Sequence, residues 1–253
     1  MAEILPEIET FARIKVVGIG GGGVTTLGAS TINDNATYLV STGNTLAFAG
    51  NRTFTGGGVS SSGTSLGDVQ FQSGTVTFSS GSTYNPNGKT VFSGGSALFN
   101  GGATTFTGGL DLISGSLGGS ANLTVPGTAA FNWSGGTLGA GGSLTTGAAT
   151  LSGLATLTRN WTASGTINVA STGTLDLNGG SLTAPTLNVA GLLKGKGTVT
   201  GNVVNTGTVA PGASPGVITV AGDYTQSSTG ILQLELGGLS PGAGHDQLVV
   251  TGN

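Results

Sequence analysis

The chain has 253 residues, of which 51 are glycine and none is cysteine, and only 7% are charged. Such low charge argues against a helical surface, which needs Lys, Glu and Arg, and the lack of cysteine excludes disulfides and thiolate metal sites. A net charge of -3, with no run of Lys or Arg, argues against nucleic-acid binding, whereas 36% hydrophobic residues spread evenly along the chain favour repetitive β structure over disorder.

The first 23 residues differ in composition from the rest of the chain. Five of the seventeen charged residues lie among the first fifteen, and the stretch lacks the apolar core of a secretory signal peptide. A short apolar strand, 12–17, leads into the glycines of 20–23. A phosphate-binding loop needs a helix directly after its glycines, and the residues from Val24 to Ser30 do not begin one. We therefore expect residues 1–23 to be a leader without a fold of its own.

From Val24 onward the sequence consists of short segments in which apolar and polar residues alternate. Such alternation places the apolar side chains on one face of a short strand. The clearest segments are 69–71, 75–78, 174–177 and 217–220. Glycine-rich turns lie between segments of this kind, at 93–95, 100–102, 134–136 and 178–180. Residues 24–253 are accordingly predicted to form one repeat domain.

Large apolar residues recur every six to eight positions through the middle of the chain. They are Phe92, Phe99, Phe106, Leu112, Leu117, Leu123, Phe131, Leu138, Leu144, Leu151 and Leu157. Hairpin sandwiches show strands at longer spacings of about eight to twelve residues. A parallel β-helix suits the shorter spacing, and coils of about twenty residues give about eleven coils and a rod of some 50 Å. The predicted fold class is therefore all-β, a parallel β-helix or solenoid.

The segment from Gly195 to Asn253 resembles a known family. Gly197 to Gly216, the strand Val217 to Val220, Gly222-Asp223-Tyr224-Thr225-Gln226 and Asp246 to Gly252 are similar to passenger repeats of bacterial autotransporters and related adhesin-like proteins. The resemblance implies a right-handed parallel β-helix that is exported to the cell surface or beyond. Chains of that family continue into further strands, so we expect the last coil here to be uncapped and prone to end-to-end association.

The leader resembles a different family. Over about 23 residues, its acidic lead-in, the segment Arg13-Ile14-Lys15-Val16-Val17-Gly18 and the glycines 20–23 are similar to the N-terminus of the tubulin-like bacterial division GTPase FtsZ. The resemblance implies that Gly20 to Gly23 would approach nucleotide phosphates. The second phosphate loop of that family does not occur in this chain, so we expect a leader joined to an unrelated β-helix and no nucleotide site.

Candidate catalytic groups are few and scattered. Acid chemistry on a sugar needs clustered carboxylates, whereas five aspartates stand apart in sequence: Asp34, Asp68, Asp111, Asp176 and Asp223. Stacking of coils could still bring such residues together. The single histidine, His245, adjoins Asp246, but it has no second histidine or cysteine to complete a metal site, and we interpret it as part of a surface turn.

Two further features allow a functional and a structural interpretation. Trp133, Trp161, Tyr38, Tyr84 and Tyr224 could form a sugar-stacking platform or fill the core, and the sequence leaves both open. Tyr84-Asn85-Pro86-Asn87-Gly88 resembles an element of haemagglutinin-type secretion domains, but it is more simply a turn with a left-handed corner at Asn87-Gly88.

The sequence thus predicts a non-enzymatic structural or adhesive β-helix at a bacterial surface or outside the cell. No catalytic, cofactor-binding or metal-binding residue is assigned. The expected partner is a cell-surface or matrix component, a glycan among the candidates, with no nucleic acid and no insertion of this segment into a membrane. The second hypothesis is a carbohydrate-binding or carbohydrate-active β-helix, and the most remote is a GTP-binding remnant.

Overall fold

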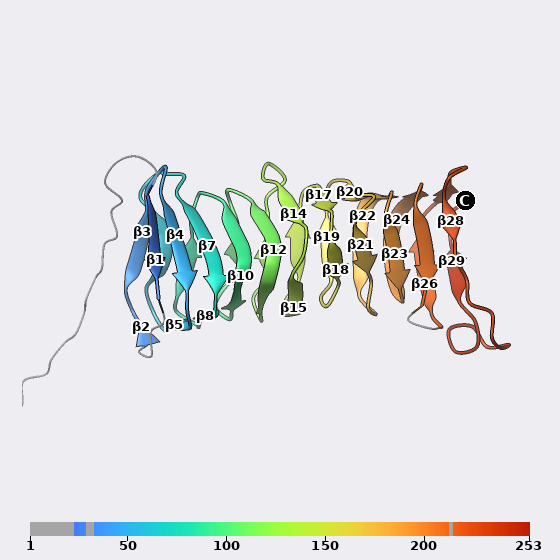
Figure 1. Cartoon of the computed structure of the whole chain (residues 1–253), viewed down its shortest axis with the longest axis horizontal. Helices are drawn as coiled ribbons and strands as arrows, with labels where there is room; N and C mark the ends of the chain where they lie inside the picture. The colour runs from blue at the N-terminus through green and yellow to red at the C-terminus, as the bar shows by residue number, and fades with distance from the viewer. Residues whose placement is uncertain (1–22, 29–32, 213–214) are drawn as a thin grey trace, which may run out of the picture.

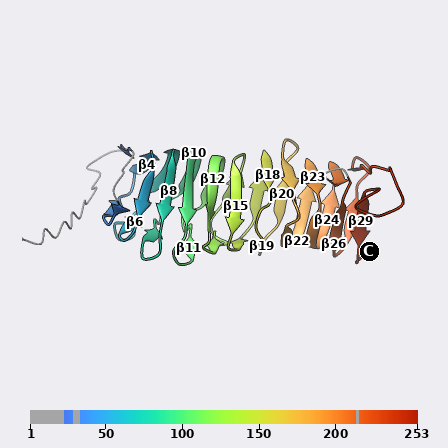
Figure 2. The same ribbon diagram turned by 90° about the horizontal axis from the view of Figure 1, so that it is seen from below.

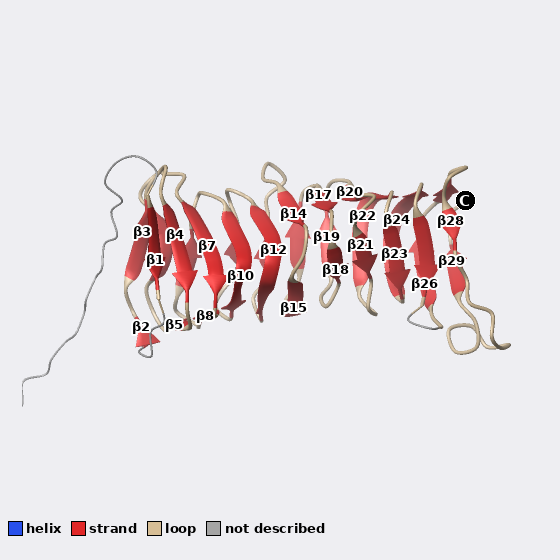
Figure 3. Cartoon of the chain, in the orientation of Figure 1, coloured by secondary structure: helices blue, strands red, loops and turns tan. Residues whose placement is uncertain are grey.

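The computed structural model describes residues 23–28, 33–212 and 215–253. Every regular element in these residues is a β-strand, and the strands stack as a β-solenoid of about 10 turns (Figure 1). Figure 3 shows strands and loops alone along the whole stack, and among the described residues no helix is long and apolar enough to cross a membrane. The expected parallel β-helix is confirmed, while its right-handed sense stays a prediction. Residues 1–22 of the leader lie outside the described residues.

The solenoid has three faces, each a stack of parallel strands. Face 1 consists of β1 (Val24–Leu27), β4 (Thr45–Ala49), β7 (Asp68–Ser73), the first halves of β10 (Thr90–Phe99) and β12 (Leu110–Gly119), β14 (Phe131–Trp133), β17 (Ala149–Leu151), β20 (Ile167–Val169), the second halves of β22 (Ser181–Val189) and β24 (Gly197–Asn205), and β27 (Tyr224–Gln226). This ladder runs without a break from one end to the other.

Face 2 is parallel as well, but it is divided in two. It consists of β2 (Asn33–Asp34), β5 (Arg52–Phe54), β8 (Thr75–Phe78), the second halves of β10 and β12, and β15 (Thr137–Gly141), followed by β18 (Leu154–Thr156), β21 (Thr174–Asp176), β23 (Leu192–Gly195), β25 (Thr208–Pro211) and β28 (Ile231–Leu232). β15 lies against β18, but the two strands belong to separate sheets.

Face 3 is also parallel, and like face 2 it is divided into two sheets. It consists of β3 (Thr37–Val40), β6 (Gly58–Ser61) and β9 (Thr83–Asn85), followed by β11 (Thr104–Thr105), β13 (Leu123–Thr124), β16 (Leu144–Thr146), β19 (Trp161–Ala163), the first halves of β22 and β24, β26 (Val217–Ala221) and β29 (Gln247–Val250). The break lies between β9 and β11, which belong to different sheets. Seen from below, in Figure 2, the strands still follow one another along a single straight axis.

The repeat length varies while the register is kept. Paired residues are 16 positions apart between Leu187 and Val203 and 30 apart between Ile218 and Leu248. The extra residues of the longest coil form the loop between β28 and β29 (Figure 1). Loops at the corners therefore absorb the differences in length, because a one-residue slip in a strand would turn its apolar side chains outward.

Large side chains fill the interior in columns. All eleven apolar residues singled out between Phe92 and Leu157 are at most 1% exposed, so that prediction is confirmed. On face 1, Phe71 stacks on Phe48 at 5.3 Å and on Phe92 at 4.7 Å between ring centroids. On face 2, Phe78 stacks on Phe54 and on Phe99, each at 4.9 Å. Each ring lies above the ring of the coil before it, because paired residues point in the same direction.

One predicted corner differs from the structure. A left-handed residue was expected at Asn87 or Gly88, but neither has a positive φ, and in the described residues Asn178 is the one residue other than glycine that has one. The bend at Asn87 is held instead by side chains, since its N–H donates to Ser61 Oγ at 2.6 Å and its amide donates to Gly63 O at 3.0 Å. Gly88 is needed because a Cβ would lie 2.1 Å from the carbonyl oxygen of Gly67.

Close contact between coils predicts which glycines tolerate a side chain. Gly201 has a φ of +126°, and a Cβ there would lie 1.7 Å from the carbonyl oxygen of Ala184 in the coil below. We expect Gly201→Ala to lower the free energy of unfolding by about 1–3 kcal/mol in urea denaturation, because the backbone must move. Gly102→Ala is the matched control, since a Cβ there meets no atom within 4 Å. Equal effects of the two substitutions would contradict this description of coil packing.

Candidate functional site

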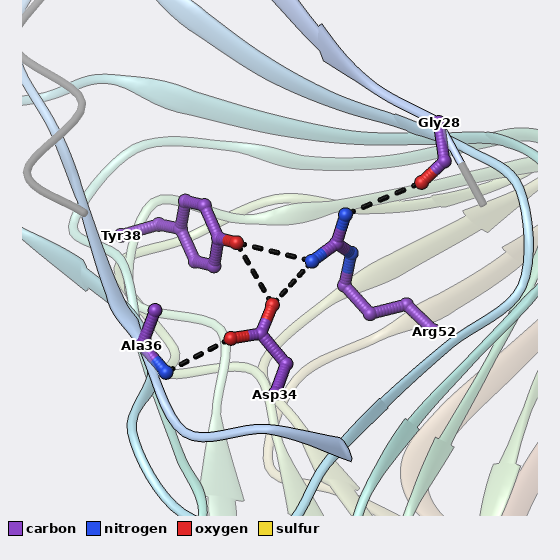
Figure 4. Close-up of polar contacts among 5 residues, drawn as sticks. All are labelled: Gly28, Asp34, Ala36, Tyr38 and Arg52. Atoms are coloured by element: carbon purple, nitrogen blue, oxygen red, sulfur yellow. Dashed lines mark hydrogen bonds and ion pairs between the residues drawn. The ribbon is translucent and has the colours of Figure 1, made fainter. Parts of the chain in front are cut away.

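A polar cluster closes the N-terminal end of the core (Figure 4). Asp34 pairs with Phe54 and Tyr38 with Val59, so both polar residues continue inward-facing columns. Asp34 accepts hydrogen bonds from the Tyr38 hydroxyl and from the Ala36 N–H, each at 2.8 Å. Arg52 forms an ion pair with Asp34, and it donates to Tyr38 Oη at 3.0 Å and to Gly28 O at 3.3 Å.

The cluster is buried, and its charged groups bind one another, although Arg52 Nε has no hydrogen-bond partner. Asp34 is 9% exposed and Tyr38 is 3% exposed, and the Arg52 guanidinium carbon lies 5.6 Å from the centre of the Tyr38 ring. Burial, together with the hydrogen bond to Asp34, raises the pKa of Tyr38 to about 12. Because the carboxylate, the phenol and the guanidinium bind one another, the cluster forms a polar cap on the apolar column; it does not form an open site.

A second buried arginine lies at the break in face 2. Arg159 is 4% exposed and lies between β18 and β19. Its Nε donates to Gly139 O at 2.8 Å and its Nη2 to Gly119 O at 3.2 Å, so its guanidinium binds the carbonyl groups of two lower coils. Burial lowers the pKa of Arg159. This side chain thus ties coils together where β15 and β18 do not pair.

Both arginines can be recognised in the sequence by their position in the alternation of apolar and polar residues. Arg52 stands two residues before Phe54, and Arg159 stands two residues before Trp161, so each occupies an inward position of an alternating segment. A charged residue at a position where the alternation predicts an apolar one is conspicuous in a chain with so few charges. Sequence reasoning treated the aspartates as the candidates and did not single out these two residues.

The other predicted carboxylates lie apart along the rod. Lys89 connects two of them, since its N–H donates to Asp68 at 2.8 Å and its ammonium lies 3.0 Å from Asp111. Asp176 pairs with Lys194 at 3.4 Å on face 2, and Asp223 accepts the Asn253 N–H at 2.9 Å. In the described part of the chain, no group of three His, Asp or Glu residues is placed to hold a metal ion. Stacking thus brings a lysine between two aspartates.

The His245-Asp246 pair lies in the loop between β28 and β29. Asp246 is 5% exposed, and its two carboxylate oxygens accept the Gly216 and Glu235 N–H groups, each at 2.8 Å. His245 Nδ1 lies 2.9 Å from Gly238 O. The interpretation of His245 as part of a turn agrees with these contacts, in which Asp246 anchors the loop.

The aromatic residues belong mainly to the core. Trp133, Trp161, Tyr38 and Tyr84 are each less than 9% exposed, and the Trp161 indole donates to Thr146 Oγ1 at 2.9 Å. Four of the five candidates for a sugar platform are therefore core residues. Tyr224, the fifth, is half-buried near the C-terminal end, where its hydroxyl bonds to Asn205 and Gln226.

A cleft of about 260 Å³ lies at the break in face 3. Ser82 to Asn85 line one side and Gly101 to Thr105 the other, and Phe78 and Phe99 lie beneath. These two rings and that of Tyr84, which also lines the cleft, are at most 8% exposed, and no charged residue lines it, so it lacks the open aromatic faces and the acid that would favour a carbohydrate site.

Comparison with protein-family models, with curated proteins and with solved structures finds no match to this chain. Its residues and their geometry therefore carry the functional argument.

The buried phenol predicts how stability depends on pH. A tyrosine in the unfolded chain loses its proton near pH ~10, whereas Tyr38 in the folded chain keeps it to about pH 12. Between these values the folded state binds more protons, so the free energy of unfolding falls as pH rises. Urea denaturation across this interval should show a smaller loss in Tyr38→Phe than in the unaltered chain. Equal slopes would contradict the proposed burial of this phenol.

Proposed function

We propose that the chain is a non-catalytic structural and adhesive module. It would stand at a bacterial cell surface or outside the cell as the passenger-type β-helix of an autotransporter-like secreted protein. The observation that carries this proposal is the continuous column of buried side chains along the solenoid. The charged residues described above add ion pairs and hydrogen bonds between coils. A rod held in this way presents long polar faces at a distance from whatever anchors it.

The C-terminal repeats support the autotransporter-like assignment. The segment that resembles passenger repeats folds here into successive coils, with β24, β26 and β29 adjacent on face 3. Its Asp246 holds the loop that precedes β29. The resembling residues thus have definite structural roles in the solenoid.

An adhesion assay tests this function. Beads coupled to the chain should be retained on epithelial cell layers, on matrix proteins or on a glycan array more strongly than beads coupled to an inert protein of similar charge. The chain should also resist protease until it is denatured, because its backbone lies in ladders. Retention equal to that of the inert protein on every surface, or rapid digestion of the folded chain, would contradict the proposal.

The C-terminal end offers a surface for self-association. Leu232 pairs with Val209 and Val250 with Val220, so both continue inward columns, yet they are 39% and 36% exposed. In the described ladders, β28 and β29 each pair on one side only. We propose that two copies associate through this end, because a second strand edge would cover the apolar residues and satisfy the backbone groups together.

Sedimentation velocity at increasing concentration tests the end-to-end contact. The unaltered chain should form dimers, and Val250→Asp should shift it to monomer by placing a charge in the apolar end. Leu154→Asp is the control, since Leu154 is 54% exposed on the side of the rod, and it should leave the dimer intact. A monomeric unaltered chain, or equal loss of the dimer in both variants, would refute this contact.

A further inference from the structure

Face 3 carries a column of threonines in register over six successive coils. The column is Thr105, Thr124, Thr145, Thr162, Thr183 and Thr200, each paired with the next. Five of the six side chains are exposed, and Thr124 is half-buried. The residue just before each of these threonines points into the core. These inward residues are Thr104, Leu123, Leu144, Trp161, Leu182 and Val199.

A second polar column runs beside the first, two residues earlier in the chain at each coil. It consists of Asn122, Ser143, Asn160, Ser181 and Thr198, beside Thr124 to Thr200, and it continues to Thr219 in the next coil, whereas Ala103 stands beside Thr105. Ser143 Oγ donates to Asn122 Oδ1 at 3.1 Å, and Ser181 Oγ donates to Asn160 Oδ1 at 2.8 Å. Ser181 pairs with Thr198 and Thr198 with Thr219. The two columns form a two-dimensional array of hydroxyl and amide groups, which we call the threonine array.

Sheet geometry sets the two repeats of this array. Adjacent coils are about 4.8 Å apart, and residues two positions apart in one strand are about 6.7 Å apart. Threonine is stiff at χ1 because it is β-branched, so each methyl and hydroxyl is held in a fixed direction. A hydroxyl both donates and accepts hydrogen bonds, which lets the array order water molecules at its own spacing.

The fold does not by itself require this regularity. Over the same coils, the corresponding outward column of face 1 reads Asp111, Asn132, Thr150, Asn168 and Asn188. On face 2, an outward column contains Thr156, Asp176, Lys194 and Ala210. Coils on faces 1 and 2 therefore stack without the same outward residue in each coil, whereas face 3 has threonine in six successive coils. Cross-strand threonine pairs also stabilise a sheet.

The chemistry of the array limits the classes of ligand that it could bind. Neither column contains a charged residue, so the surface does not attract ions or phosphates. Neither contains an aromatic residue, so it lacks the stacking faces that bind crystalline polysaccharides. A regular surface of hydroxyl, methyl and amide groups matches a ligand that is itself a lattice of hydrogen-bonding oxygen atoms. On its prism faces, hexagonal ice presents oxygen atoms with two repeats close to those of the array.

We propose that the threonine array of face 3 is an ice-binding surface. The ordered hydroxyls and methyls hold water in a lattice that merges with the ice crystal, and the register of the coils keeps the threonines in line. This function is additional to the adhesive role, and the two would be compatible if the adhesive surface lies elsewhere on the rod.

Measurement of thermal hysteresis and of ice-crystal shape in purified chain tests the proposal. The unaltered chain should depress the freezing point below the melting point and produce faceted crystals. Thr162→Tyr should abolish both effects, because its ring projects from the middle of the array. Thr162→Lys is a second variant that disrupts the array with a charge.

Thr150→Tyr is the matched control, since Thr150 is an exposed threonine at an equivalent outward position of face 1. It should keep full hysteresis, and circular dichroism should show that all variants fold alike. No hysteresis and no faceting by the unaltered chain would overturn the proposal and leave the array a stabilising ladder only. Equal loss in Thr150→Tyr and the Thr162 variants would overturn it as well.

Discussion

The stacking of inward side chains on their counterparts in the next coil is the interaction on which the rest of the structure depends. Phe48, Phe71 and Phe92 occupy one column, and Leu112, Trp133 and Leu151 continue it. Parallel register brings these side chains into contact, and their burial in turn holds the register, because a slipped strand would expose them. The outer faces are then free to carry polar residues without weakening the core.

Charged residues and Asn205 enter the inward columns where the stacking ends or is interrupted, whereas threonines such as Thr90 and Thr146 are buried between these places as well. Asp34, Tyr38 and Arg52 close the N-terminal end, and Asn205 takes the inward position near the other end, where its amide donates to Ile231 O at 3.0 Å. Arg159 spans the break between the two parts of face 2. In each place the buried side chain has hydrogen-bond partners from neighbouring coils, which offset the cost of burying it, and only Arg52 Nε among the described side chains is buried without one. Stability is therefore carried by contacts between coils along the whole rod.

Much of the fold could be predicted from the sequence because its signal is periodic. The spacing of Phe92, Phe99 and Phe106 indicated short strands with tight corners, and all three are buried. The pairing of Asp34 with Arg52 could not be predicted in the same way, because it depends on which residues lie one coil apart while the repeat length varies from 16 to 30. The same uncertainty concealed the threonine array: Thr145 and Thr162 are 17 positions apart, whereas Thr124 and Thr145 are 21 apart.

The proposed adhesive and ice-binding functions both depend on one straight stack of about 10 coils that forms a rod. Small-angle X-ray scattering of the purified monomer tests it most directly. A solenoid predicts a pair-distance distribution with an early maximum from the narrow cross-section and a long decline to a maximum dimension at least as large as the rod, about 50 Å. A symmetric distribution typical of a sphere, or the scattering of an unfolded chain, would contradict the account.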